Sequence, residues 1–164
     1  NNMMKQKANL LSKINKNAKK LIHSMSQNNI PTQQIAKKTY ARSKKLVIHE
    51  CPDGSAGYTI NKGLSMCICC EKNNVCNSFE DAFFVVLHEL AHVMSDEYGH
   101  GEEFKNNFDI IIKYAVKIGL YIPKDYAKNN VEYCGVKITT SPCDGDQCTK
   151  NNLDYYFKES LLQY

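Results

Sequence analysis

Apolar residues recur every three or four positions along three segments of the chain, which is the spacing of one face of an α-helix. The first segment covers residues 3–28, where lysines occupy the opposite face, and Pro31 favours an end of the helix just before it. The second covers about residues 79–96, and Ser78 with an acidic residue three positions later is typical of a helix start. The third covers about residues 101–118. We therefore expect three helices, of which the first is long and amphipathic.

Between the first and second helices, short runs of β-forming residues alternate with turn-forming residues, as in β-strands. The predicted strands are Lys45–Cys51, Gly57–Ile60 and Leu64–Cys70, separated by the turn sequences PDG and NKG. An antiparallel meander is the simplest arrangement of three such strands. Beyond the third helix, Val131–Thr139 resembles a strand or an extended flap, and Leu153–Leu162 a short final helix. The pattern predicts an α+β fold with a small antiparallel sheet.

The second predicted helix carries the sequence HELAH at residues 88–92. Residues four apart lie one turn apart on the same face of a helix, so His88 and His92 can direct both imidazoles at one metal ion. Glu89 lies about 100° around the helix from His88, which places its carboxylate beside the metal. The large apolar residues lie on the opposite face of this helix. The spacing predicts a zinc site in which Glu89 takes a proton from water and passes it to the leaving amine of a cleaved peptide.

A catalytic zinc ion needs three protein ligands and one open position. His100, between Gly99 and Gly101, is the best third ligand, because glycines allow the chain to turn sharply back toward the metal. Nearby carboxylates are rivals, since zinc also binds oxygen: Asp96, Glu97, Glu102 and Glu103. His23 and His49 are remote in sequence, and we expect them to be ordinary surface or packing residues.

The HELAH segment and the sequence GHGEEF at residues 99–104 together resemble the signature of the SprT-like and WLM metalloproteases. This family includes the Spartan-related proteases of DNA–protein crosslinks, and it pairs an HExxH helix with a third histidine in an HGxxF-like turn. Residues 58–63 and the strand after them also resemble the WLM arrangement before its metal helix. The resemblance covers about residues 45–120 and extends to WLM-type proteins of large DNA viruses.

The resemblance implies a zincin-like metalloprotease domain with a small sheet, an HExxH helix and a following helix. Together with the helix pattern, it divides the chain into a basic helical segment (1–44), this domain (45–140) and a C-terminal tail packed on or near it (141–164). The zinc ligands and the general base that it implies are His88, His92, His100 and Glu89.

The net charge of +4 conceals an uneven distribution of charge along the chain. The first 45 residues hold ten Lys, one Arg and no acidic residue, whereas the remaining 119 hold ten Lys against seventeen Asp and Glu. A basic block of +11 on an acidic body of −7 is expected for a protein that binds a polyanion such as DNA, and the alternative is a solvated lysine-rich helix.

No apolar run reaches the roughly 18 residues of a membrane span, and the N-terminus lacks a signal-peptide pattern. We therefore expect an intracellular protein (nuclear, cytoplasmic or virion-associated) that does not span a membrane.

The chain contains eight cysteines, for which we expect reduced thiols or metal ligands because no signal peptide is present. Cys67 and Cys70 have the spacing of zinc ligands, and Cys76 could join them. However, adjacent residues of a strand point to opposite faces, which favours small buried side chains instead. Cys143 and Cys148 could close a short loop as a disulfide or hold a metal there.

These patterns predict a zinc-dependent endopeptidase that uses water and forms no covalent intermediate, with DNA-bound or DNA-crosslinked proteins as candidate substrates. The alternative is a nucleic-acid-binding protein whose zinc site is structural or vestigial. A cysteine-rich interaction module is a third hypothesis, but a structural site needs no general base such as Glu89. Tyr98, Tyr121 and Tyr133 could each reach the cleft, and none is assigned a role.

Overall fold

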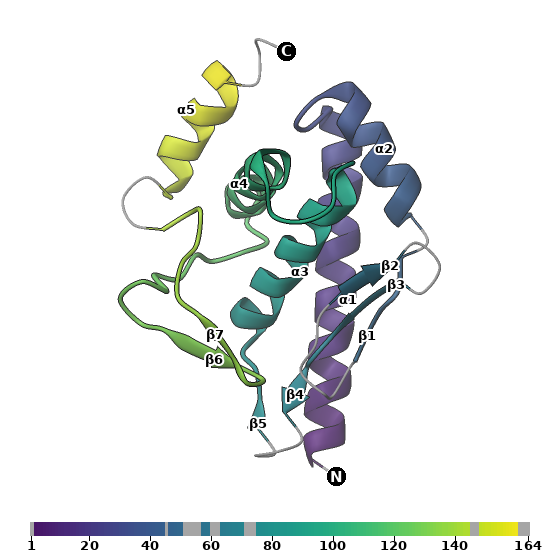
Figure 1. The fold of residues 1–164 in the computed structure, drawn as a ribbon, viewed down its shortest axis with the longest axis vertical. Helices are drawn as coiled ribbons and strands as arrows, with labels where there is room; N and C mark the ends of the chain where they lie inside the picture. The colour runs from purple at the N-terminus through teal and green to yellow at the C-terminus, as the bar shows by residue number, and fades with distance from the viewer. Residues whose placement is uncertain are drawn as a thin grey trace.

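The computed structural model describes residues 2–44, 46–50, 57–59, 63–70, 75–144 and 148–160. Its helices are α1 (Asn2–Asn28), α2 (Gln33–Ser43), α3 (Phe79–Met94), α4 (Glu102–Lys117) and α5 (Lys150–Ser160). Its strands are β1 (Ile48–Glu50), β2 (Gly57–Thr59), β3 (Gly63–Met66), β4 (Cys69–Cys70), β5 (Val75–Cys76), β6 (Val131–Tyr133) and β7 (Val136–Ile138). The fold is α+β, as predicted, and α3 crosses the centre of the view in Figure 1.

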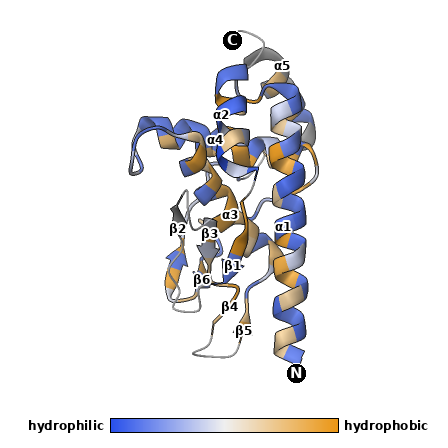
Figure 2. Cartoon of the chain, turned by 90° about the vertical axis from the view of Figure 1, so that its right-hand side faces the viewer, coloured by the Kyte–Doolittle hydropathy of each residue, from blue (hydrophilic) through white to orange (hydrophobic). Residues whose placement is uncertain are grey.

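The N-terminal helix α1 is part of the main core. Its apolar stripe is buried, and Ile14 and Leu21 have no exposed surface. The helix contacts α2, α3 and β1, while mostly hydrophilic residues follow its outer side (Figure 2). The long amphipathic helix is therefore confirmed. The pattern predicted that the first helix ends before Pro31 but did not predict α2. This second helix begins after Thr32, whose side chain accepts a hydrogen bond from the backbone N–H of Ile35.

The three-stranded sheet is mixed, and the predicted antiparallel meander was wrong. The strand order is β1-β3-β2, with β2 antiparallel and β1 parallel to β3. This arrangement buries Ile48, Leu64 and Met66, which are at most 2% exposed, in the core that α1 and α3 cover. The turn sequences could not predict that β1 pairs with β3 rather than with β2. This pairing depends on the burial of β1 against helices that are distant in sequence.

The strand boundaries also differ from the predicted ones. The run Leu64–Cys70 holds two strands, β3 and β4, and β4 pairs with β5, which was not predicted. The PDG turn, the first two residues of the NKG turn and three ends of the predicted strands lie outside the described residues. These ends are Lys45, Cys51 and Ile60.

Helix α3 carries His88 and His92, and its other face is buried. Ser78 caps it by accepting a hydrogen bond from the backbone N–H of Asp81, as the sequence predicted. Phe83, Leu87 and Leu90 have no exposed surface, and the helix packs against α1, α2 and α4. Since its apolar face is fixed on three sides, the polar face of α3 is held in one orientation.

The chain after α4 forms a hairpin and then a last helix. Strands β6 and β7 pair antiparallel around a turn at Cys134 and Gly135, which have φ values of 47° and 85°. The segment predicted as a strand or flap is thus a two-stranded hairpin. Helix α5 packs on α4 through Tyr114 and Phe157, whose ring centroids are 5.4 Å apart. The sequence predicted that this helix starts at Leu153, whereas α5 starts at Lys150. Its predicted end, Leu162, lies outside the described residues. No described helix is long and apolar enough to cross a membrane.

Six cysteines form disulfides, so the prediction of reduced thiols or metal ligands is wrong for the four in the first two pairs below. The pairs are Cys67–Cys134, Cys69–Cys76 and Cys143–Cys148. The second pair bridges directly opposed residues of β4 and β5, and the third is the local bond that was one of two predicted alternatives. The first ties the chain after β3 to the turn of the β6–β7 hairpin. Cys70 is free, and Cys51 lies outside the described residues.

Candidate metal centre

His88 and His92 project from one face of α3. Their ring centroids are 5.2 Å apart, as expected for side chains one helical turn apart. Both are half-buried, whereas Leu87 and Leu90 on the other side of the helix are fully buried. The prediction that the two histidines lie away from the core is confirmed.

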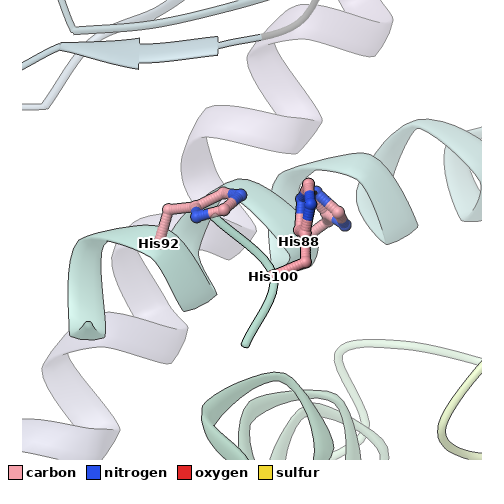
Figure 3. A group of neighbouring side chains, drawn as sticks. All are labelled: His88, His92 and His100. Carbon is pink, nitrogen blue, oxygen red and sulfur yellow. The ribbon is translucent and has the colours of Figure 1, made fainter. Parts of the chain in front are cut away.

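His100 completes a cluster of three imidazoles. It lies in the loop between α3 and α4, where Gly99 adopts a φ of +90°, a left-handed conformation that favours glycine. The Nε2 atoms of His100 and His88 are 3.2 Å apart. One ring nitrogen from each of the three histidines lies within 4.8 Å of the others, and Figure 3 shows the rings gathered beside α3. These histidines could hold a metal ion, with His92 as the third member.

Two of the acidic rivals of His100, Asp96 and Glu103, bind other groups. Helix α3 ends before Asp96, so this residue does not continue the histidine face. Its carboxylate lies 3.0 Å from the ammonium of Lys38 and 2.8 Å from the guanidinium of Arg42. Hydrogen bonds from these two groups lower the pKa of Asp96. Glu103 accepts hydrogen bonds from the backbone N–H groups of Asp96 and Glu97. Asp96 and Glu103 therefore stabilise the loop between α3 and α4.

Arg42 of α2 holds the same loop from the other side. Its Nη1 donates hydrogen bonds to the carbonyl oxygens of Val93 at 2.9 Å and Ser95 at 3.1 Å. Carbonyl groups at a helix end lack helical partners, so these bonds cap the end of α3. The sequence indicated Arg42 only as part of the basic block, and no local signal could have shown a contact 51 residues away.

Two phenylalanines of α4 pack against the imidazoles. Phe104 stacks on His92 with ring centroids 4.3 Å apart and meets the edge of His88 at 4.9 Å. Phe108 also meets His88, at 5.4 Å. These contacts restrict the rotation of the histidine rings. The sequence indicated both phenylalanines as apolar helix positions, and the motif included Phe104, but neither signal showed the ring packing.

Burial favours the neutral form of the two helical histidines. Desolvation lowers the pKa of His88 from 6.5 to about 4, with further contributions from His92 and His100. Desolvation and the proximity of His100 also lower the pKa of His92. Metal ions bind the neutral imidazole, so at neutral pH both rings can act as ligands without losing a proton.

Glu89 lies next to His88 in the helix and is nearly buried, with 7% of its surface exposed. Burial raises the pKa of its carboxyl group from 4.5 to about 7. A group with a pKa near the working pH can both accept and return a proton. This is the property that a general base in peptide hydrolysis requires.

The histidine cluster borders a cavity of about 630 Å³. His88, Glu89 and His100 line it together with residues of α4, and the segment 136–140 from the β6–β7 hairpin forms part of its wall. The hairpin therefore has the position that we predicted for a flap. Tyr133 also lines the cavity.

The hydroxyl of Tyr133 donates a hydrogen bond to the carbonyl of Cys67, so this tyrosine anchors the hairpin. Tyr98 is fully exposed and Tyr121 is buried, and neither lines the cavity. His23, on the exposed face of α1, is separate from the cluster. None of these side chains adds a ligand.

Comparison with known proteins finds viral relatives and no activity. No family model and no solved structure matches the chain. It is similar to an uncharacterized protein of Acanthamoeba polyphaga mimivirus, 37% identical over 101 residues, which cover 59% of this chain and 51% of the relative. An uncharacterized protein of Invertebrate iridescent virus 6 is 37% identical over 86 residues, 50% of this chain and 47% of the relative. One of Invertebrate iridescent virus 3 is 43% identical over 54 residues, 32% of each chain. The chain thus spans about half the length of the first two relatives, and its similarity is to viral proteins.

Proposed function

We propose that this protein is a zinc-dependent endopeptidase of the SprT-like/WLM type, with a zincin-like catalytic domain. The observation that carries the proposal is the convergence of His88, His92 and His100 beside the nearly buried Glu89 at an open cavity. The resemblance of the HELAH and GHGEEF segments to the family signature supports it. The viral origin of the relatives agrees with a viral member of that family.

The donor set fits zinc. Three imidazoles with one position left for water form a common catalytic zinc site, whereas structural sites are closed by four protein ligands. The three histidine nitrogens lie within 4.8 Å of one another, which suits one shared ion. Among the described residues, no carboxylate or cysteine belongs to this group. The arrangement therefore favours a catalytic site over the alternative of a structural one.

The residues of the site have distinct roles in the proposed reaction. When bound, zinc supplies a Lewis acid that polarises the scissile carbonyl and makes water acidic near neutral pH. Glu89 takes a proton from the attacking water and returns it to the nitrogen of the leaving amine. His88, His92 and His100 would hold the ion through one ring nitrogen each.

The test is hydrolysis of an unfolded protein such as casein by the full chain, first stripped of metal and then given one equivalent of zinc. We expect cleavage that a chelator abolishes and zinc restores. His23→Ala is the control, because His23 is an exposed histidine outside the cluster, and it should behave as the wild type. Zinc binding without cleavage of any peptide mixture would contradict the proposal.

The exposed face of α1 favours a second function, the binding of DNA. Lys16 and Lys20 lie opposite the buried stripe of α1, and neither is within 4 Å of a described carboxylate. Part of the basic block is neutralised within the protein, since Lys38 and Arg42 bind Asp96. The polyanion partner would therefore contact α1 and would bring DNA-bound proteins near the peptidase site.

We predict that duplex DNA binds the wild type with an affinity that falls steeply as salt increases, because bound lysines release counterions from the phosphates. Replacing Lys16 and Lys20 with Ala should reduce the slope of log affinity against log salt by about 2. The control is Lys128→Ala, an exposed lysine outside α1. Binding that is independent of salt, or unchanged in the double variant, would contradict this function.

A further inference from the structure

The cavity beside the histidine cluster has an apolar interior. Phe84, Phe104 and Phe108 from α3 and α4 line it, and all three rings are largely buried. Val136 and Ile138 of β7 line the facing wall, and Val136 is 58% exposed although it is apolar. Cavities with such a lining bind apolar groups, since burial removes apolar surface from water. The interior therefore accepts a large apolar side chain.

Two lysines line the same cavity from different elements, Lys105 from α4 and Lys137 from β7. The nearest described carboxylate to Lys105 is that of Glu102, at 4.0 Å, in a pair that is mostly exposed and therefore contributes little. No described carboxylate lies within 4 Å of Lys137. Among the described residues that line this cavity, Glu89 is the one with an acidic side chain. The cavity is thus locally basic on a body whose overall charge is negative.

Strand β7 offers an edge along which an extended peptide can lie. It pairs with β6 on one side, and no other described strand pairs with it on the other. The hairpin is held in place by the disulfide from Cys134 to Cys67 and by the hydroxyl of Tyr133. A peptide strand added to such an edge gains main-chain hydrogen bonds, and its side chains alternate between two faces. When one side chain enters the apolar interior, its neighbours face the rim.

We propose that this cavity selects peptide segments in which a large apolar residue is flanked by Asp or Glu. The apolar side chain occupies the interior, and the flanking carboxylates lie near Lys105 and Lys137. The inference rests on the proposed peptidase function for the position of the cleaved bond. The binding preference itself can be measured without hydrolysis.

The experiment compares four synthetic peptides of equal length in which the central residue is Phe or Ser and its neighbours are Glu or Gln. Binding is measured with the zinc-loaded Glu89→Gln variant, and kcat/KM with the zinc-loaded wild type. With central Phe, we expect the Glu peptide to exceed the Gln peptide by about 5-fold at low salt and by less at high salt. Replacing Phe with Ser should weaken binding by about 10-fold or more.

The Lys105→Glu/Lys137→Glu double variant should reverse the preference, so that a peptide with Lys beside Phe binds best. The matched control, Lys128→Glu, changes an exposed lysine outside the cavity and should keep the wild-type preference. Equal affinity for the Glu and Gln peptides, or a preference that survives in the double variant, would overturn the proposal. So would a single-stranded oligonucleotide that displaces the acidic peptide at equal concentration, because the lysines would then form a general polyanion site.

The two proposals fail in different ways. If no peptide is hydrolysed but the Glu–Phe–Glu peptide still binds selectively, the peptidase function is wrong and the binding preference stands. If peptides are hydrolysed without regard to flanking charge, the preference is wrong and the peptidase function stands.

Discussion

At the scale of single residues, burial acts on two kinds of titratable group in opposite directions. It lowers the pKa of His88 to about 4 and raises that of Glu89 to about 7. In both cases the neutral form is favoured, because transfer of a charge out of water costs free energy. Near neutral pH the two helical histidines of the metal-free site are therefore mostly neutral, whereas Glu89 is divided between its two forms. A bound cation changes this balance, since it favours the ionised form of Glu89.

We predict that Glu89→Gln stabilises the metal-free protein at alkaline pH. The pKa of Glu89 is higher in the folded chain (about 7) than its ordinary value of 4.5. The folded state thus holds the proton more tightly, and the wild type loses stability as pH rises from 4.5 through 7. The variant cannot titrate at this position, so its advantage should grow over this window to on the order of 3 kcal/mol above pH 7.

Urea unfolding of both metal-free proteins at pH 5 and pH 8 measures this difference. His88 contributes equally to both proteins and cancels in the comparison. A difference that stays constant between the two pH values would show that Glu89 is not buried as described. Zinc should shrink the difference at pH 8 because it favours the carboxylate.

The proposed role of His100 as the third zinc ligand leads to a separate prediction. His100→Ala should lower zinc affinity by at least 100-fold, since loss of a group that only supports a ligand already costs about 10–100-fold. His100 is exposed, so the stability of the metal-free protein should hardly change. Competition with a chromogenic chelator measures the affinity, and His23→Ala is the control. An unchanged affinity would mean that a different residue is the third ligand.

At the scale of secondary-structure elements, the candidate metal centre depends on how three helices hold one loop. Arg42 of α2 caps the end of α3 and binds Asp96, while Glu103 of α4 accepts hydrogen bonds from the loop backbone. Gly99 gives the loop its left-handed turn. The position of His100 therefore depends on the turn at Gly99 and on contacts from α2 and α4, which are distant in sequence or in the next helix.

We predict that Arg42→Ala lowers zinc affinity by about 10-fold, because the loop that carries His100 loses its anchor. Arg42→Lys should recover part of the affinity, since a lysine can still bind Asp96 but cannot form the same fork of hydrogen bonds. The control is Lys37→Ala, which removes an exposed cation from the same helix. If Arg42→Ala lowers the unfolding free energy but leaves zinc affinity unchanged, its role is only structural.

Sequence patterns correctly predicted the features that depend on neighbouring residues, such as helix caps, buried helix faces and turns. The start of α3 followed from Ser78, and its buried face followed from the spacing of residues such as Leu87 and Leu90. Likewise, the glycines beside His100 indicated the reversal of the chain. The parallel pairing of β1 with β3 could not be predicted in this way, because it depends on which edge of β3 packs under distant helices.

At the scale of the whole molecule, long-range contacts join parts that the sequence presents as separate. Helix α1 belongs to the basic segment but packs in the same core as α3. The disulfide between Cys67 and Cys134 joins residues 67 positions apart and fastens the flap. Such pairings cannot be inferred from spacing, since any two of eight cysteines could meet.

Charge is also organised over the whole molecule. The basic block contributes to the fold through Arg42 and to a solvent-exposed surface through α1, whereas the cavity has its own basic rim. The overall charge of +4 therefore describes none of these surfaces. Their separate functions can be tested separately, because the lysines of α1 do not line the cavity.

The central claim is that Glu89 is the general base of a zinc peptidase, and the most direct test is to compare wild type and Glu89→Gln for zinc content and peptide hydrolysis in the same preparation. Glutamine preserves the size and hydrogen-bonding capacity of the side chain but cannot take a proton from water. We predict one zinc per chain in both proteins, with hydrolysis reduced by about 100-fold or more in the variant. Hydrolysis by Glu89→Gln at the wild-type rate, with zinc bound, would contradict the account.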